Sequence, residues 1–488
     1  METKKTSVRR IAFIVFLFIF AGQSLLSALV QPAPDIPRLE PRSEALAFTE
    51  GFNVSDWRSL FSLAWWVSGG ANAESAVTSF EPAVKELATS ADSLDDRAKA
   101  ELVLAFMHKK FLSAYAVRQS RLDTLFTTGR FNCISSAMLY AILASSLDLE
   151  VTGVMTHDHA FCSIKIAGQA IDVETTNPYG FDPGSNKEFH DAFGKVTGFA
   201  YVPPGNYRDR TPIDLKTLFS LVLSNEISDV EAAGRFSDAV GLAVDRWTLL
   251  GGGSGSNFEA LVDCMINFGT ALMREGREND ALDWSARATA VYGSNPKWVD
   301  FTVAAANNRI VKLIRAGQYT DAYSQLNDLR PRLSQSVAEG LAATIAEAEL
   351  IAVMKATQND VDENQFLTAL SSARQAGIIP EDRIREIEIV WRLNRINRVA
   401  SLEGWAAAYA ATKQAIEELG SDVRLQSSLR IYRSNRIAEL YNAAAAAYNA
   451  GNYAEAKKLT TDALKEFPDE GRFRSLLSTI ERTGNSFQ

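Results

Sequence analysis

The sequence predicts an α+β domain followed by an all-α array of helical repeats, and two observations lead to this prediction. An apolar helix that opens with Asn132-Cys133 is followed by two strand-like segments joined at Ala167-Gly168. A short phrase containing a turn residue, an aromatic residue and an alanine then recurs through the C-terminal half. Basic residues and a long apolar run open the chain. With 488 residues, the chain has room for two or three domains with separate cores.

The first 30 residues have the pattern of a segment that directs a protein to a membrane. Four basic residues up to Arg10 precede the apolar run from Ile11 to Gly22, and the next charge after Arg10 is Asp35. Such a pattern sends the following chain across the membrane, either as a removed signal peptide or as a signal anchor. Both alternatives stay open, because about 20 apolar residues can also span a bilayer. The chain is therefore expected to be exported, either periplasmic or extracytoplasmic or held at the membrane by its N-terminus.

Residues 31–42 are rich in proline and predict an extended tether. Residues 43–215 form the predicted α+β domain, with a helical first part and a core over residues 90–207. Ser55-Asp56 is a suitable cap for a helix beginning at Trp57, and a further helix is expected from Asp96. The end of this core is marked by a predicted turn at Tyr201-Val-Pro-Pro-Gly205.

Cys133 lies where the predicted helix begins, and this position favours a reactive thiol. The positive end of the helix dipole and the unpaired N–H groups of the first turn both stabilise a thiolate. The same N–H groups can hold the oxyanion that forms when a carbonyl is attacked. The other two cysteines, Cys162 and Cys264, do not make a disulfide framework, so one free thiol with a function is the economical interpretation.

Alternation along the first strand separates two sets of side chains. Cys162 shares one face with Ile164 and Ile166, whereas His157 and His159 share the other. Cys162 is therefore expected in the core. His159 is the preferred base because it is embedded in the strand, and His157 remains an alternative nearer the fraying start.

A two-residue turn at Ala167-Gly168 sets the register of the hairpin. That register pairs Ile166 with Gln169, Ser163 with Asp172, Phe161 with Glu174 and His159 with Thr176. Glu174 is then displaced from His159 by about 7 Å along the strand and Asp172 by about 13 Å, at about 3.3 Å per residue. Glu174 is thus favoured over Asp172 as the acid that orients His159. A turn at Ile166-Ala167 would bring Asp172 closer, but it would move Gly168 out of the turn.

Residues 216–488 repeat a phrase at intervals of about 39 to 48 residues. The phrase is a turn residue, an aromatic residue two positions later and an alanine five positions later. Clear copies start at Gly234, Gly317 and Gly451. Weaker copies start at Gly276, which has Glu278 in place of the aromatic residue, and at Asn364 and Glu403. Glycine permits the sharp turn, the aromatic fills space between paired helices and alanine allows their close approach. The pattern resembles tetratricopeptide-type hairpins with a longer period than the usual 34 residues. Such arrays offer a surface to a peptide or protein partner, although a stack that only braces the first domain is the alternative.

Composition and motifs exclude several other classes of function. The net charge is −9, and no basic stripe is interleaved with aromatic residues, so no nucleic-acid partner is expected. The sequence has no CxxC or HExxH spacing and only four histidines, so neither a metal nor a cofactor is expected. The glycine-rich segment 251–256 lacks the Gly-Lys-Ser/Thr ending of a phosphate-binding loop and is interpreted as a connection.

The region around Cys133 resembles the transglutaminase-like superfamily, which has a papain-like fold and a Cys-His-Asp triad. The resemblance is carried by Gly129-x-x-Asn-Cys133, His159-Ala-Phe161 and Ile-Asp172-Val-Glu174-Thr-Thr176. It implies that Cys133 is the nucleophile and His159 the general base and acid. The orienting acid would be Asp172 by residue type or Glu174 by register. Two departures are Phe161, where tryptophan is frequent, and an upstream oxyanion-hole side chain that cannot be placed.

These observations favour an exported thiol enzyme that acts on an amide bond of a peptide, protein or cell-envelope substrate. Hydrolysis and transamidation stay open, because both pass through the same acyl-enzyme. The loop at residues 177–184 is expected at the rim of the cleft, where Tyr179 and Phe181 either line the substrate or pack the loop. The alternative function is a repeat-containing adaptor whose first domain only binds.

Overall fold

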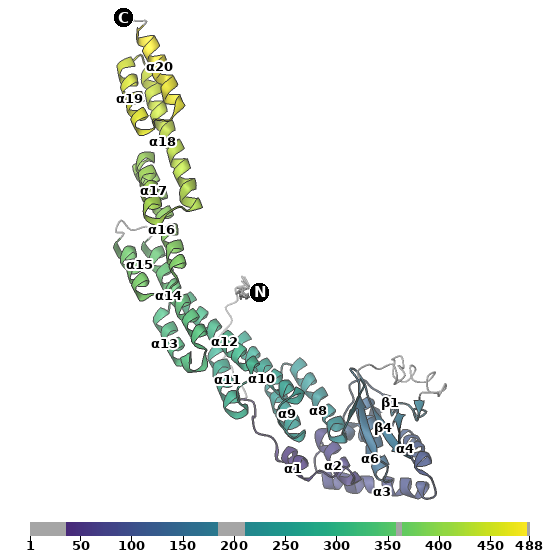
Figure 1. Ribbon diagram of the computed structural model, residues 1–488. Coiled ribbons are helices and arrows are strands. Elements are labelled where there is room, and N and C mark those ends of the chain that lie inside the picture. The colour runs from purple at the N-terminus through teal and green to yellow at the C-terminus, as the bar shows by residue number, and fades with distance from the viewer. Residues whose placement is uncertain (1–35, 184–209, 358–363, 486–488) are drawn as a thin grey trace, which may run out of the picture.

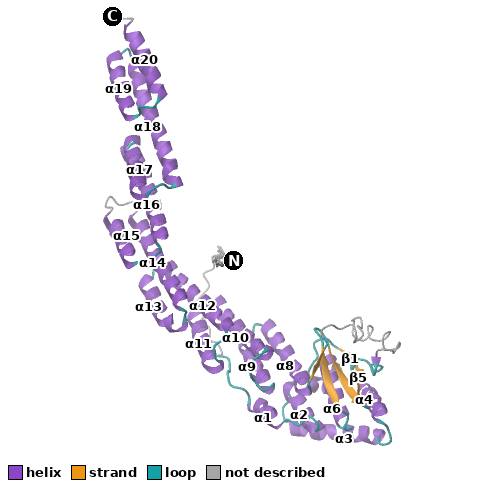
Figure 2. Ribbon diagram, viewed as in Figure 1, coloured by secondary structure: helices purple, strands orange, loops and turns teal. Residues whose placement is uncertain are grey.

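The computed structural model describes residues 36–183, 210–357 and 364–485, and these residues are mostly helical with a small antiparallel sheet. This arrangement agrees with the predicted α+β layout in its broad sense. The sheet and the helices around it lie at one end of the molecule, and the later helices continue from it as a long, curved rod (Figure 1). The strands of the sheet are confined to that one end (Figure 2).

The first part of the chain is helical, as predicted. Its helices are α1 (Ser43–Gly51), α2 (Trp57–Val67), α3 (Ala73–Ala91), α4 (Asp96–Lys110), α5 (Leu122–Thr128) and α6 (Cys133–Ser145). The Asp56 carboxylate accepts a hydrogen bond from the N–H of Arg58 and so caps α2, which confirms the expected cap. Helix α4 begins at Asp96, as expected.

Four strands form the main sheet in the order β5-β4-β3-β6, with all neighbours antiparallel. They are β3 (Val151–Met155), β4 (Ala160–Ile166), β5 (Gln169–Val173) and β6 (Thr211–Ile213). The predicted β4–β5 register is confirmed from Cys162 to Gln169, including the pair Ser163–Asp172. Ala167 and Gly168 both have positive φ, as a two-residue hairpin turn requires. The sequence did not reveal β3 or the short edge strand β6.

A second, two-stranded parallel sheet lies directly before α6. It consists of β1 (Ala114–Tyr115) and β2 (Arg130–Phe131), and Tyr115 pairs with Phe131. Because α6 begins two residues after Phe131, this pairing fixes the backbone of β1 close to the start of that helix.

Helix α6 lies at the centre of the first core. Every residue from Ile134 to Ala144 is buried, because the helix packs against β3 and β4 and also against α2, α4 and α8. A helix that is apolar on all sides needs such complete cover. The core therefore fixes the position of Cys133 at the helix start.

Helix α8 (Leu215–Ala232) belongs both to this core and to the helical array. Its residues Leu218, Phe219 and Val222 are buried in the first core cluster, while its other side packs on α9 (Phe236–Leu249). Gly153 in β3 allows the close approach, since a Cβ there would lie 3.1 Å from Leu218 Cβ. The array is thus joined to the α+β part through shared packing.

The remaining helices form successive antiparallel pairs along the rod. They are α10 (Ser256–Arg274), α11 (Glu278–Tyr292), α12 (Pro296–Arg315), α13 (Tyr319–Leu329), the short 3-10 turn η3 (Arg330–Arg332), α14 (Gln335–Thr357), α15 (Asn364–Ala376), α16 (Glu381–Glu403), α17 (Trp405–Leu419), α18 (Val423–Asn449), α19 (Tyr453–Glu466) and α20 (Gly471–Asn485). Their buried residues fall into a series of separate small clusters. Each pair is therefore stabilised by its immediate neighbours.

The recurring phrase marks the start of the second helix of each pair. These second helices are α9, α11, α13, α15, α17 and α19, and each begins within two residues of the turn position. The alanine of the phrase is fully buried in every copy except the fourth, where Ala369 is half-buried. The role expected for the aromatic residue holds best at Phe366, which is fully buried; Trp405 is 37% exposed. The glycine-rich segment connects α9 to α10.

The part of the proline-rich segment that the structure describes, residues 36–42, packs along the array instead of hanging free. Arg38 and Arg42 both bond the fully buried carboxylate of Asp245 on α9, with N···O distances of 2.7 Å. Tyr292 donates a hydrogen bond to the carbonyl of Leu39. These contacts attach the segment to helices more than 200 residues away in sequence.

The predicted signal or anchor, residues 1–30, lies outside the described residues. Among the helices that the structure does describe, none is both long enough and apolar enough to cross a membrane.

Candidate active site

The backbone around Asn132 places Cys133 as the first residue of α6. The Asn132 side chain accepts hydrogen bonds from the N–H groups of Ile134 (3.0 Å) and Ser135 (3.1 Å). Ser135 Oγ in turn accepts a hydrogen bond from the Asn132 N–H, which completes a capping box. The Cys133 thiol is free and half-buried, and it lies at the positive end of the helix.

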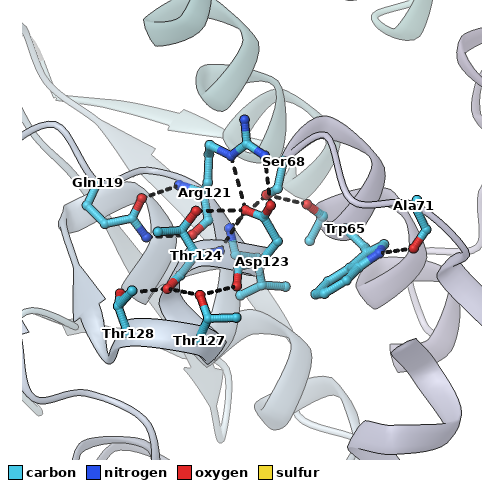
Figure 3. A network of polar contacts seen from close by, with 11 residues as sticks. Trp65, Ser68, Ala71, Gln119, Arg121, Asp123, Thr124, Thr127 and Thr128 are labelled. Carbon is cyan, nitrogen blue, oxygen red and sulfur yellow. Dashed lines mark hydrogen bonds and ion pairs between the residues drawn. The ribbon is translucent and has the colours of Figure 1, made fainter. Parts of the chain in front are cut away.

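A network of polar contacts holds the segment between β1 and β2, and Figure 3 shows the part of it around Gln119, Arg121 and Asp123. Gln119 donates hydrogen bonds from Nε2 to the carbonyls of Arg121 (2.7 Å) and Arg130 (3.1 Å). Arg121 pairs with Asp123 at 2.7 Å, and Ser135 Oγ donates to the carbonyl of Gln119 at 2.8 Å. The network therefore ties the segment between β1 and β2 to the first turn of α6.

His159 lies between Cys133 and Glu174. Its Nε2 is 2.6 Å from Glu174 Oε2, and its ring is hydrogen-bonded to the Cys133 sulfur. Since Glu174 occupies Nε2, Nδ1 is the ring nitrogen that can face the sulfur. The structure thus brings together the thiol, the imidazole and the favoured carboxylate of the sequence prediction.

The Glu174 carboxylate is held from two sides and is shielded from solvent. Only 2% of the residue is exposed. Its second oxygen, Oε1, accepts hydrogen bonds from the N–H (3.1 Å) and the hydroxyl (2.6 Å) of Thr176. The carboxylate therefore has a fixed orientation, and it fixes the His159 ring in turn.

Burial and charge act in opposite directions on this pair. Burial alone would lower the pKa of His159, but the Glu174 carboxylate and the Cys133 sulfur hold that pKa well above its usual value. Burial would raise the pKa of Glu174, but the His159 charge and the hydrogen bonds from His159 and Thr176 lower it. Both directions favour an imidazolium beside a carboxylate.

Asp172, the alternative acid, does not contact His159. It pairs instead with the guanidinium of Arg210, with 2.7 Å between Nη1 and Oδ2. The guanidinium also lies over the Phe161 ring, which stacks beside His159. The strand register explains the difference, because Asp172 is opposite Ser163. No sequence pattern indicated Arg210, which lies 38 residues from Asp172.

His157 and Cys162 are the two other residues that the sequence prediction considered. His157 is exposed in the turn between β3 and β4. His159 lies just before the first residue of β4, so the prediction that it is embedded in the strand was wrong, and the β4–β5 ladder begins only at Cys162 and Val173. Cys162 is fully buried and donates a hydrogen bond from its sulfur to the carbonyl of Ala137. Burial raises the pKa of its thiol. Burial also raises the pKa of Cys264 to about 12. Neither thiol is suited to react.

The loop after β5 lies at the predicted rim, and the structure describes it up to Pro183. The carbonyl of Gly180 accepts a hydrogen bond from the Glu174 N–H (2.8 Å), so the loop folds back on the acid. Arg97 pairs with Asp182 at 2.8 Å and lies over the Phe181 ring, which fastens the loop to α4. Phe181 therefore packs the loop, whereas Tyr179 is 53% exposed.

Two further residues near the site, His108 and Tyr115, were not predicted from the sequence. His108 bonds the carbonyl of Thr175 through Nε2 at 3.0 Å, and burial lowers its pKa to about 4. Tyr115 lies edge-on against Phe131, with 5.9 Å between the ring centroids, and burial raises the pKa of its phenol. Only the strand pairing of β1 with β2 brings Tyr115 to this place.

Over the described ranges, no group of three or more histidine, cysteine, aspartate or glutamate side chains could hold a metal ion. Comparison with protein-family models found no model that matches the chain, and comparison with curated proteins found no match either.

Proposed function

We propose that this protein is an exported thiol enzyme that cleaves or transfers an amide bond through Cys133, His159 and Glu174. The single observation that carries the proposal is the contact chain from the Cys133 sulfur through the His159 ring to the buried Glu174 carboxylate. A thiol, a base and an orienting acid in this order are the requirements of nucleophilic acyl transfer. The resemblance to the transglutaminase-like superfamily supports the same chemistry.

Each residue has a role that follows from its position. The Cys133 thiolate attacks the carbonyl carbon, which forms a carbon–sulfur bond and leaves the negative charge on the carbonyl oxygen. The His159 imidazolium then gives its proton to the leaving nitrogen, the carbon–nitrogen bond breaks, and a thioester remains on Cys133. Water or an amine, deprotonated by neutral His159, attacks the thioester and releases the sulfur. Glu174 stabilises the imidazolium and holds the ring in place throughout.

The energetics of the pair also support a role in catalysis. Removing a carboxylate and an imidazolium from water costs several kcal/mol per ion, and a well-packed apolar pair at the same place is often as stable or more so. Residues that serve packing alone are therefore rarely of this kind. The half-buried Cys133 next to the pair contrasts with the two sealed thiols elsewhere.

The helical array is proposed to recruit the substrate or a partner. Successive α-hairpins of the tetratricopeptide-like kind present an extended surface to peptide segments. Shared packing on α8 joins that surface directly to the core that holds Cys133. A substrate bound on the array would therefore be held at a fixed place relative to the thiol.

Alkylation of the full chain with iodoacetamide, followed by peptide mass spectrometry, tests the proposal. Cys133 should react at least about 100-fold faster than Cys162 and Cys264, because thiolate character and access set the rate. His159→Ala should slow the Cys133 reaction about tenfold or more, since the imidazolium that stabilises the thiolate is gone. His157→Ala is the matched control and should leave the rate unchanged.

Slow and equal labelling of the three thiols would contradict the enzyme and favour the adaptor. The same conclusion would follow if Cys133 reacted quickly but with no dependence on His159.

A further inference from the structure

The oxygen of the attacked carbonyl needs hydrogen-bond donors, and the first turn of α6 supplies few of them. An oxyanion is best stabilised by preorganised donors, of which two are usual in acyl-transfer sites. The N–H groups of Ile134 and Ser135 already donate to the Asn132 side chain. The N–H of Cys133 remains as one donor from the helix start. A second donor must come from another element.

Two nearby side chains with N–H groups are already engaged. The Gln119 amide donates to the carbonyls of Arg121 and Arg130, so it is directed away into its own loop. His108 has a pKa lowered to about 4, so it is neutral near pH 7, and its Nε2 is bonded to Thr175 O. Both groups therefore hold the backbone around the site, and neither is available to donate a hydrogen bond to an oxyanion.

Tyr115 is fixed close to Cys133 by its backbone. It pairs with Phe131 in the β1–β2 sheet, and the N–H of Ala116 donates to the carbonyl of Phe131 at 2.7 Å. Asn132 Nδ2 donates to the carbonyl of Val117 at 3.0 Å. The segment that follows Tyr115 is thus bonded to the two residues that immediately precede the nucleophile.

The Tyr115 side chain has the properties of an available donor. Its ring is half-buried and lies edge-on against Phe131, with 5.9 Å between centroids. Within the described part of the chain, its hydroxyl makes no hydrogen bond. Burial, and then the charges of Cys133 and Glu174, raise the pKa of the phenol above its usual value. The phenol therefore keeps its proton throughout the pH range in which the site would work.

We propose that the phenol O–H of Tyr115 is the second oxyanion donor, acting together with the N–H of Cys133. Tyr115 is then a catalytic residue of the acyl-transfer site, and this inference rests on the proposed function. In the step concerned, the sulfur–carbon bond forms and the π electrons of the carbonyl move to its oxygen. Tyr115 donates a hydrogen bond to that oxygen and keeps its proton. When the tetrahedral intermediate collapses, the carbonyl reforms and the leaving group departs.

The test compares two reagents that attack the same sulfur. p-Nitrophenyl acetate acylates Cys133 through a tetrahedral oxyanion, whereas iodoacetamide alkylates it by displacement at carbon with no oxyanion. Tyr115→Phe keeps the ring on Phe131 and removes only the hydroxyl. The rate of p-nitrophenolate release should fall about 100- to 1000-fold in this variant, as for loss of one oxyanion donor. The rate of iodoacetamide alkylation should stay within twofold of wild type.

Tyr441→Phe is the matched control, since it removes a phenol hydroxyl from a half-buried ring that packs against Phe473 in the array, and it should change neither rate. If Tyr115→Phe slows both reactions equally, the residue acts on the thiolate or on packing, and the inference is wrong. If neither rate changes, it is wrong as well. Failure of the proposed function is distinguishable, because the wild-type protein itself would then lack His159-dependent reaction of Cys133.

Discussion

The region around Cys133, which we call the corner and which comprises the start of α6, His159 and the segment from Glu174 to Thr176, differs from the helical array in the partners of its buried hydroxyl groups. In the array, buried threonines such as Thr412 and Thr460 donate to the carbonyl four residues earlier in their own helix. In the corner, the partners come from different elements. Ser136 of α6 bonds Thr175, and His159 before β4 bonds Glu174 after β5.

These two kinds of hydrogen bond place different demands on the fold. A hydroxyl bonded within its own helix places no demand on the rest of the fold. A network that spans several elements requires all of them to be placed correctly, and a partly satisfied one is costly. Polar contacts between elements are also buried in the array, where Asp245 pairs with Arg38 and Arg42 and Ser285 bonds Thr302. Around Cys133, by contrast, the contacts link a half-buried thiol, an imidazole and a buried carboxylate, and this combination supports the proposed site.

The largest effect is expected from removing the acid of the network. Glu174→Ala leaves the buried His159 without its carboxylate and should lower the free energy of unfolding by about 3–5 kcal/mol. It should also slow Cys133 alkylation at pH 7 about tenfold or more. Asp172→Ala is the matched control, because this carboxylate pairs with Arg210 and does not contact His159, so its loss should leave Cys133 alkylation unchanged. Chemical denaturation and alkylation rates check both values, and equal effects of the two variants would contradict the assignment.

The second prediction concerns pH and uses Glu174→Gln. In the wild-type protein the raised pKa of His159 keeps the imidazolium charged well above pH 6.5, so its contribution to stability is lost only at higher pH. The lowered pKa of Glu174 means that the contribution of the carboxylate disappears as the pH falls below about 4.5. The variant removes the charge, so the pKa of His159 should fall and the basic limb of Cys133 alkylation should move to lower pH. NMR titration of the His159 ring provides the second measurement. If the basic limb of the alkylation profile does not move, the pairing of His159 with Glu174 is contradicted.

The third prediction concerns the loop that closes over the acid. A Cβ at Gly180 would lie 2.0 Å from the Glu174 carbonyl oxygen, which is backbone and cannot move aside. Gly180→Ala should therefore lower stability by about 3 kcal/mol and slow Cys133 alkylation as Glu174 shifts. Gly317→Ala in the array is the control for stability. Gly317 has positive φ, so this substitution should also destabilise the protein, but it should leave the reactivity of Cys133 unchanged.

The smallest effect compares two fully buried threonines. Thr176→Val removes the hydroxyl bonded to the charged Glu174 and should cost about 2 kcal/mol. Thr412→Val removes a hydroxyl bonded within its own helix and should cost less than about 1 kcal/mol. Only the first change should alter the pH dependence of Cys133 alkylation. Indistinguishable losses in denaturation experiments would remove the contrast between the two regions.

Local rules in the sequence predicted much of the fold. The period of two along the strands and the turn at Ala167-Gly168 were enough to set the β4–β5 register. The glycine, aromatic and alanine phrase marked where the second helix of each pair begins. Asn132 before an apolar run identified the start of α6. Each of these features depends on residues close together in the chain.

Contacts between distant residues were beyond such rules. The strand count placed Glu174 about 7 Å along the strand from His159. The structure shows direct contact, because the chain leaves the strand after Val173 and Glu174 bonds back to Gly180. Arg210 on Asp172, Tyr115 beside Phe131 and α8 in the first core all depend on packing between segments far apart in sequence.

The most direct test of the central claim is whether His159 and Glu174 act on Cys133 as one unit. Alkylation rates of Cys133 would be measured in His159→Ala, in Glu174→Ala and in the double variant. Since the acid acts only through the ring, the double variant should react as slowly as His159→Ala alone, with no further loss. If the two effects instead multiply, Glu174 influences the thiol independently of His159, and the proposed site is wrong.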